Sequence, residues 1–259
     1  MGIVNVTPDS FSDGGRFLEP DAAVEHGLRL AAEGAAVLDV GGASTRPGAE
    51  PVPLADELER AVPVVERLAA AGQRVSIDTT KAEVAAAALE AGASLVNDVS
   101  AFRFAPEIAG LVADAGAECC LVHMRGEPRT MQAEARYEDV VGEVKAFLEE
   151  RLEFAREAGI AEERVWLDPG IGFGKTAEHN LELLRRLDEL VAIGRPLVIG
   201  TSRKSFLGKL LGGREPDERL PGTIATNVMA YERGASVFRV HDVRPVADAL
   251  AIATATFGP

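Results

Sequence analysis

The sequence predicts an α/β fold in which eight parallel strands close into a barrel, and three observations support this. Eight short, β-prone apolar runs recur along the 259 residues, and segments with helical spacing separate them. The runs start roughly 20 to 45 residues apart, which leaves room for a crossover helix after each strand. The runs are also almost continuously apolar, as expected of parallel strands buried on both faces.

The strand and helix patterns alternate in order along the whole chain. Apolar stripes at helical spacing lie between the strands, for example Leu181, Leu184, Leu187 and Val191, or Val141, Val144, Leu148 and Leu152. The predicted strands are Ile3–Val6, Ala36–Val40, Val75–Ile77, Ser94–Val96, Cys119–Val122, Val165–Leu167, Leu197–Ile199 and Val237–Val240.

A doubly wound open sheet is the main rival to the barrel. It would usually carry a G-x-G-x-x-G fingerprint after the first strand, and the segment NVTPDSFSDGG lacks that spacing. No linker or composition shift divides the chain. We therefore predict one closed (β/α)₈ TIM barrel over residues 1–259, with its active site at the C-terminal strand ends.

Composition excludes several classes of partner. The net charge is −14 and only 5% of residues are aromatic, so we expect no nucleic-acid partner. Apolar stretches such as Ala35–Val40 are too short to cross a bilayer, and the N-terminus lacks a secretory signal. We expect a cytoplasmic protein without membrane contact, in which the neighbouring Cys119 and Cys120 are buried thiols.

Polar side chains follow every predicted strand, as Asn5, Asp39, Asp78, Asn97, His123, Asp168, Thr201 and Arg239 illustrate. Helix caps and turns explain any one of them taken singly. Helix capping does not require a polar residue after every one of the eight strands, so we predict that these residues form an active site. Two long loops, residues 7–19 and 41–53, follow the first two strands and are interpreted either as lids or as ordinary turns.

Basic residues gather after strands seven and eight, where barrels often bind phosphate. They are Arg203, Lys204, Arg239 and His241, and Arg46 joins them from the second loop. This cluster suits a phosphoryl or pyrophosphate group. The alternative is that Arg203 or Arg239 pairs with an acidic neighbour such as Asp242.

The side chains of Asp78, Asn97 and Asp168 should converge at the barrel mouth. Two carboxylates and an amide suit the N–H donors of a guanine-like heterocycle. A metal caged by protein needs more ligands than these, whereas Mg²⁺ held mainly by substrate phosphates needs only one side chain.

The motifs GIVNVTPDSFSDGG, DVGGASTRPG, SIDTTK, NDVSA, HMRGEPRTMQ, DPGIGFGK, TSRKSF and RVHDV occur in the order and spacing of the dihydropteroate synthases. The sequence resembles that pterin-binding TIM-barrel family over essentially its whole length. Ala43 is a departure, because the family commonly has Glu there. The chain also starts at the first strand, where many members have an N-terminal hairpin.

The resemblance implies condensation of 6-hydroxymethyl-7,8-dihydropterin diphosphate with 4-aminobenzoate, giving 7,8-dihydropteroate and pyrophosphate for folate synthesis. It also implies Mg²⁺ as cofactor, a sulfonamide target and a homodimer, for which the apolar last helix VADALAIATATF is the expected interface. Arginines, a positively charged histidine and Mg²⁺ would stabilise the departing anion. The implied residues are Asp78, Asn97, Asp168 and Lys204 for the pterin; Thr45, Arg46, Arg239 and His241 for the diphosphate; Phe11, Pro47, Ser205 and Phe173 for 4-aminobenzoate; and Asn5 for Mg²⁺.

Three alternatives remain at this point. A pterin-dependent methyltransferase acting on a corrinoid protein would share the pterin pocket but would need no diphosphate site. A non-catalytic paralogue would only bind pterin. The third alternative concerns Ser205, whose hydroxyl would cap its helix and bind no substrate. Replacing Ser205 with alanine would then cost about 1 kcal/mol of stability.

Overall fold

The computed structural model describes residues 1–6, 20–43, 50–127, 129–131 and 135–258. All eight predicted strands are confirmed, with ends that shift by at most two residues. They are β1 (Gly2–Asn5), β2 (Leu38–Gly41), β3 (Val75–Asp78), β4 (Leu95–Asp98), β5 (Glu118–Val122), β6 (Val165–Asp168), β7 (Val198–Ile199) and β8 (Val237–Phe238).

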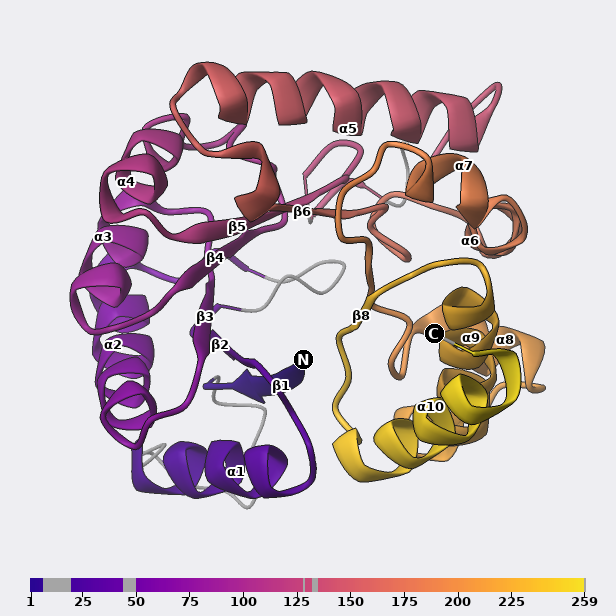
Figure 1. Cartoon of the computed structure of the whole chain (residues 1–259), viewed down its shortest axis with the longest axis horizontal. Coiled ribbons are helices and arrows are strands. Elements are labelled where there is room, and N and C mark those ends of the chain that lie inside the picture. The colour runs from indigo at the N-terminus through magenta and orange to yellow at the C-terminus, as the bar shows by residue number, and fades with distance from the viewer. Residues whose placement is uncertain (7–19, 44–49, 128, 132–134, 259) are drawn as a thin grey trace.

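The strands form a closed parallel barrel. Strands β1 to β6 pair in sequence order, and β7 pairs with β8. Single bridges join the two groups, one between Leu167 and Leu197 and one between Gly2 and Val240. The backbone N–H of Ile3 donates to the Val240 carbonyl at 3.0 Å, which links the last strand to the first. The predicted barrel is therefore confirmed (Figure 1).

Helices surround the strands (Figure 1). Apolar faces hold them against the barrel, and local caps fix where some begin: the Asp139 carboxylate accepts a hydrogen bond from the Val141 N–H at 3.2 Å. The α-helices are α1 (Pro20–Ala32), α2 (Leu54–Ala70), α3 (Ala82–Glu90), α4 (Ile108–Ala115), α5 (Val140–Glu157), α6 (Ala177–Arg185), α7 (Leu187–Val191), α8 (Ser205–Leu210), α9 (Leu220–Glu232) and α10 (Val243–Phe257), with 3₁₀ turns η1 (Glu162–Arg164) and η2 (Pro216–Arg219).

One expected helix is divided in two. The stripe from Leu181 to Val191 reads as continuous, but the backbone breaks at Arg186, with φ −110° and ψ 32°, between α6 and α7. The other stripe, from Val141 to Leu152, lies within α5 as expected. The apolar periodicity of a sequence identifies the buried face of a helix. It does not reveal a break in the helix when both halves stay packed against the same core.

The larger buried cluster consists of the outer strand faces and the helix faces packed against them, and a second, smaller cluster includes Leu95, Cys120 and Trp166. Cys119 and Cys120 are buried free thiols, as predicted. In the described part of the chain, no helix has the length and apolar character needed to cross a membrane.

Candidate functional site at the strand ends

Four neighbouring strands end in one row of residues. Parallel pairing sets Asn5 beside Gly41, Gly41 beside Asp78, and Asp78 beside Asn97. Strand β6 ends at Asp168, paired with Val122 of β5. The barrel thus brings three of the four residues predicted for pterin, Asp78, Asn97 and Asp168, to its C-terminal mouth, where such barrels carry their chemistry.

Arg239 joins these strand ends through buried ion pairs. Its Nε donates to Asp39 Oδ2 at 2.6 Å, and its Nη2 donates to Asp78 Oδ2 at 2.7 Å. Asn97 Nδ2 also donates to Asp39 Oδ2, at 3.1 Å. Asp39 was expected only as a strand-end residue without a role, whereas here it is fully buried and holds both Arg239 and Asn97.

Three buried oxygens in this network receive no hydrogen bond from any described residue. They are Asp39 Oδ1, Asp78 Oδ1 and Asn97 Oδ1. Unsatisfied buried acceptors are costly and call for an explanation. Burial raises the pKa of Asp78 to about 7, against the opposing effect of Arg239. The arrangement favours a ligand that brings several N–H donors into the barrel mouth.

Asp168 organises the loop after β6. Its Oδ1 accepts a hydrogen bond from the Gly170 N–H at 2.6 Å, and burial raises its pKa. Gly170 has φ +66°, and a Cβ at this position would collide with the His123 carbonyl. Only glycine allows so close an approach in this conformation, so the loop is held against the end of β5.

Lys175 fixes the same loop, and sequence reasoning did not single it out. Its buried ammonium donates to Gly170 O at 3.0 Å and to Phe173 O at 3.1 Å, and it lies 2.8 Å from His123 Nδ1. Burial lowers its pKa well below the usual range. The motif DPGIGFGK contains this lysine, but nothing in the motif indicates that its side chain turns inward onto its own loop.

Lys204 also lies against this loop, next to Gly172 and Phe173. Its Nζ sits 4.0 Å from the centre of the Phe173 ring, within cation–π range. Burial, followed by repulsion from Arg239, lowers the pKa of Lys204 to about 8. A predicted pterin residue and a predicted 4-aminobenzoate residue are therefore in contact.

The loops after β7 and β8 are tied together by side chains. Ser202 Oγ lies 2.9 Å from His241 Nδ1, and Arg203 forms two hydrogen bonds to the Asp242 carboxylate, at 3.0 and 2.7 Å. The pairing expected as an alternative for Arg203 is thus confirmed. Arg239 also pairs with acidic residues, but these are Asp39 and Asp78 of the barrel interior.

The surroundings of His241 favour a neutral imidazole in the ligand-free chain. Burial, with repulsion from Arg239 and Arg203, lowers its pKa to about 3. The resemblance implies a positively charged histidine beside the diphosphate, whereas without a ligand a half-buried imidazole between two guanidinium groups is costly to protonate.

Ser205 is the first residue of α8, and its side chain is exposed. Lys204 occupies the N-cap position, and no side chain caps this helix. The capping alternative for Ser205 is therefore wrong. The remaining predicted residues, Phe11, Thr45, Arg46 and Pro47, lie outside the described residues.

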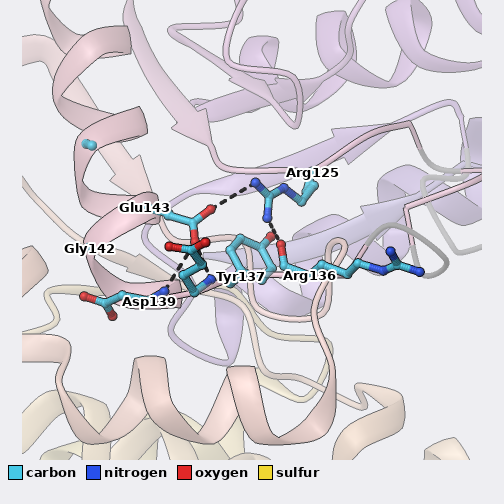
Figure 2. Close-up of a pocket in the computed structure, with 8 residues that line it drawn as sticks. Arg125, Arg136, Tyr137, Asp139, Gly142 and Glu143 are labelled. Atoms are coloured by element: carbon cyan, nitrogen blue, oxygen red, sulfur yellow. Dashed lines mark hydrogen bonds and ion pairs between the residues drawn. The ribbon is translucent and has the colours of Figure 1, made fainter.

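A cavity of about 750 Å³ lies to one side of this cluster, at the start of α5. Figure 2 shows Arg125 extending toward Glu143, with an Nη2 to Oε2 distance of 2.9 Å, while its guanidinium lies 4.2 Å from the Tyr137 ring centre. Arg125 also donates to the Arg136 carbonyl. The Arg125 guanidinium and the Glu143 carboxylate already pair with each other, whereas the strand-end cluster leaves buried acceptors without donors, so that cluster is the better candidate site.

The chain resembles one family throughout. A family model described as pterin binding enzyme matches residues 1–241. Dihydropteroate synthase of Mycobacterium leprae is 52% identical over 97% of this chain and 91% of its own length. The corresponding protein of Synechocystis is 48% identical over 98% of this chain and 89% of its own length.

Solved structures of dihydropteroate synthases also superimpose closely on this chain. A Xanthomonas albilineans dihydropteroate synthase with 4-aminobenzoic acid superimposes with a TM-score of 0.93 at 48% identity, covering 100% of this chain and 92% of its own. A Xanthomonas albilineans structure in complex with 7,8-dihydropteroate gives a TM-score of 0.89 at 45% identity, covering 100% and 93%.

Proposed function

Because the chain belongs to the pterin-binding enzymes, within the dihydropteroate synthases, we propose that its strand-end cluster performs the reaction of that family with Mg²⁺. The enzyme condenses 6-hydroxymethyl-7,8-dihydropterin diphosphate with 4-aminobenzoate and releases pyrophosphate. The expected activity is confirmed by these relatives, and they give no support to methyl transfer.

The observation that carries the site assignment is the set of buried oxygens without donors. Asp78 Oδ1 and Asn97 Oδ1 have no partner among the described residues. A pterin ring carries several N–H donors along one edge, which would satisfy them. Asp168 and the Lys204 ammonium complete the proposed pterin pocket.

The proposed diphosphate group consists of Arg239 and His241, together with Thr45 and Arg46. In the reaction, the bond between the pterin methylene carbon and the diphosphate oxygen breaks, and the amine nitrogen of 4-aminobenzoate bonds to that carbon and loses a proton. Hydrogen-bond donors and positive charge beside the departing oxygens would stabilise the negative charge that develops. Asp78 and Asp168 stabilise the positive charge left on the pterin.

The donor set around Asn5 fits Mg²⁺. Asn5 is the last residue of β1 and lies in the row of strand-end residues that contains Asp78. Among the described residues, no group of three or more His, Cys, Asp or Glu could hold a metal ion. Mg²⁺ usually keeps waters and binds one or two side chains plus substrate phosphates. Asn5 would supply that one ligand, and the ion would neutralise charge on the leaving diphosphate.

We place the 4-aminobenzoate ring against Phe173, with Phe11 and Pro47, and its carboxylate at the Ser205 hydroxyl. If the diphosphate must bind first, 4-aminobenzoate should bind weakly alone and much more tightly with pyrophosphate and Mg²⁺ present. Ser205→Ala should weaken that binding about fivefold, the value of one hydrogen bond, without lowering stability. Calorimetric titrations with and without pyrophosphate test this, and equal affinity in both would refute the binding order.

The rate should depend on pH through Lys204. Its pKa near 8 means that the ammonium loses its proton as the pH rises through 8, so kcat/KM should fall on that alkaline limb. Lys204→Arg keeps a cation that does not titrate in this range, so the limb should disappear. Parallel pH profiles from pH 6 to 10 test this, and an unchanged limb in Lys204→Arg would assign it to another group.

The homodimer and the cytoplasmic location remain proposals. For the homodimer, the support is an apolar surface on α8 to α10, where Leu210, Met229, Ile252 and Phe257 are more than half exposed. Ile252, at 70%, is the most exposed of them. A surface of this kind is typical of a protein interface.

Ile252→Asp should convert a dimer into a monomer, because it places a charge in the proposed interface. Leu28→Asp is the matched control, since Leu28 is also an exposed apolar side chain but belongs to α1 and not to the proposed surface on α8 to α10. Light scattering should give twice the chain mass for wild type and Leu28→Asp. A wild-type monomer at every concentration would contradict the dimer.

A further inference from the structure

The contact between Ser202 and His241 determines where the histidine proton lies. Two hydrogen-bond distances define it: the His241 backbone N–H donates to Ser202 Oγ at 3.1 Å, and Ser202 Oγ lies 2.9 Å from His241 Nδ1. Ser202 is 5% exposed. Ser202 Oγ thus contacts both the backbone N–H and the ring of His241.

Hydrogen-bond accounting assigns the direction of the second bond. A hydroxyl has one proton, and Ser202 has no other acceptor among the described residues. If Nδ1 carried the ring proton, the buried hydroxyl proton would have no partner. The hydroxyl therefore donates to Nδ1, which leaves the proton of a neutral imidazole on Nε2.

We propose that Ser202 is a positioning residue that holds His241 as the Nε2–H tautomer, so that His241 serves as a neutral hydrogen-bond donor to the departing diphosphate. This rests on the proposed diphosphate site. His241 Nε2 makes no hydrogen bond to a described residue, so it is available to a ligand oxygen.

The surroundings of the ring support a neutral donor. Burial of the ring and repulsion from Arg239 and Arg203 disfavour a positive charge on it; Asp242 opposes this effect, and Lys204 adds a smaller repulsion. Asp242 is itself engaged by the Arg203 guanidinium through two hydrogen bonds. A neutral donor also lets pyrophosphate leave without breaking an ion pair at this position, while Arg239 supplies the charge.

The backbone at Arg203 supports the same geometry. Arg203 has φ +57°, a conformation uncommon for a residue with a side chain. Its N–H donates to Thr223 Oγ1 at 3.2 Å, and its side chain bonds to Asp242, the neighbour of His241. Two adjacent pairs, Ser202 with His241 and Arg203 with Asp242, thus align the two loops.

The test is ¹⁵N-detected NMR of the histidine rings in the ligand-free full chain at pH 7, with His241→Gln used to assign the signal. Wild type should show an unprotonated Nδ1 and a protonated Nε2. Ser202→Ala should give a mixture of tautomers, whereas the matched control Ser236→Ala, an exposed serine before β8, should resemble wild type. A protonated Nδ1 or a doubly protonated ring in wild type would overturn the proposal.

Activity measurements separate this inference from the function it rests on. His241→Gln retains a neutral donor, so it should keep kcat within about tenfold of wild type, while His241→Ala should lose more. Ser202→Ala should weaken pyrophosphate binding about fivefold and leave pterin binding unchanged. If His241→Ala binds pyrophosphate normally, the diphosphate assignment fails, whatever tautomer is found. If Gln is no better than Ala, the neutral-donor role fails and the site assignment stands.

Discussion

Asp78→Asn is expected to weaken pterin binding by about 100-fold, because hydrogen bonds to a buried carboxylate are worth about 1.5–3 kcal/mol. Asp78 Oδ1 has no partner among the described residues, so it is free to accept from the ligand, while Oδ2 accepts from Arg239. The asparagine would replace one acceptor with a donor facing either the pterin N–H groups or the Arg239 guanidinium. Calorimetry with a pterin measures the change in affinity.

Ser76→Ala is the matched control for this experiment. Ser76 lies two residues earlier on the same strand, is fully buried, and its hydroxyl also has no partner among the described residues. Removing it should leave pterin affinity within about twofold of wild type. Equal pterin affinity in Asp78→Asn and Ser76→Ala, with both variants folded by circular dichroism, would remove Asp78 from the proposed pocket.

Arg239→Met is expected to lower both stability and activity. It leaves the buried Asp39 and Asp78 carboxylates without their cation, and breaking such a pair costs about 3–5 kcal/mol. In a chain of this size that corresponds to a melting temperature lower by about 10 °C. We expect kcat/KM to fall about 1,000-fold or more, since the diphosphate loses its buried cation.

A second substitution separates the two effects. Arg239→Met combined with Asp39→Asn should regain part of the lost melting temperature, because one uncompensated charge is removed, but it should not regain pyrophosphate binding. Arg186→Met is the control, because Arg186 also pairs with acidic residues, namely Asp139, Glu182 and Glu189, but nearer the surface, where such pairs are worth about 1 kcal/mol or less. If the double variant regained activity, Arg239 would act only by neutralising Asp39.

Most of the architecture could be predicted from the sequence, because it depends on the spacing of apolar residues that are close together in the chain. Apolar runs and helical stripes locate the strands and the buried helix faces, and chain order then brings residues such as Asp78, Asn97 and Asp168 to one mouth. The division of α6 from α7 at Arg186 was not predictable, since both halves keep the same apolar spacing.

The contacts within the site were harder to predict, because they depend on where side chains turn. The sequence names Asp39 at a strand end, but only the folded barrel sets it against Arg239, which directly follows strand β8, 200 residues away. Lys175 appears in its motif as one more cation, yet its ammonium is buried among loop carbonyls. The pKa of His241 could not be predicted from the sequence either, because it depends on neighbours from two different loops.

Pyrophosphate release by the purified full chain tests the central claim most directly. We predict release only when the pterin diphosphate, 4-aminobenzoate and Mg²⁺ are all present, in equal amount to the dihydropteroate formed, and a rate at least 100-fold lower in Asp78→Asn. Release at the same rate without 4-aminobenzoate, or in Asp78→Asn, would contradict the proposed site. No release with all three present would identify a chain that only binds pterin.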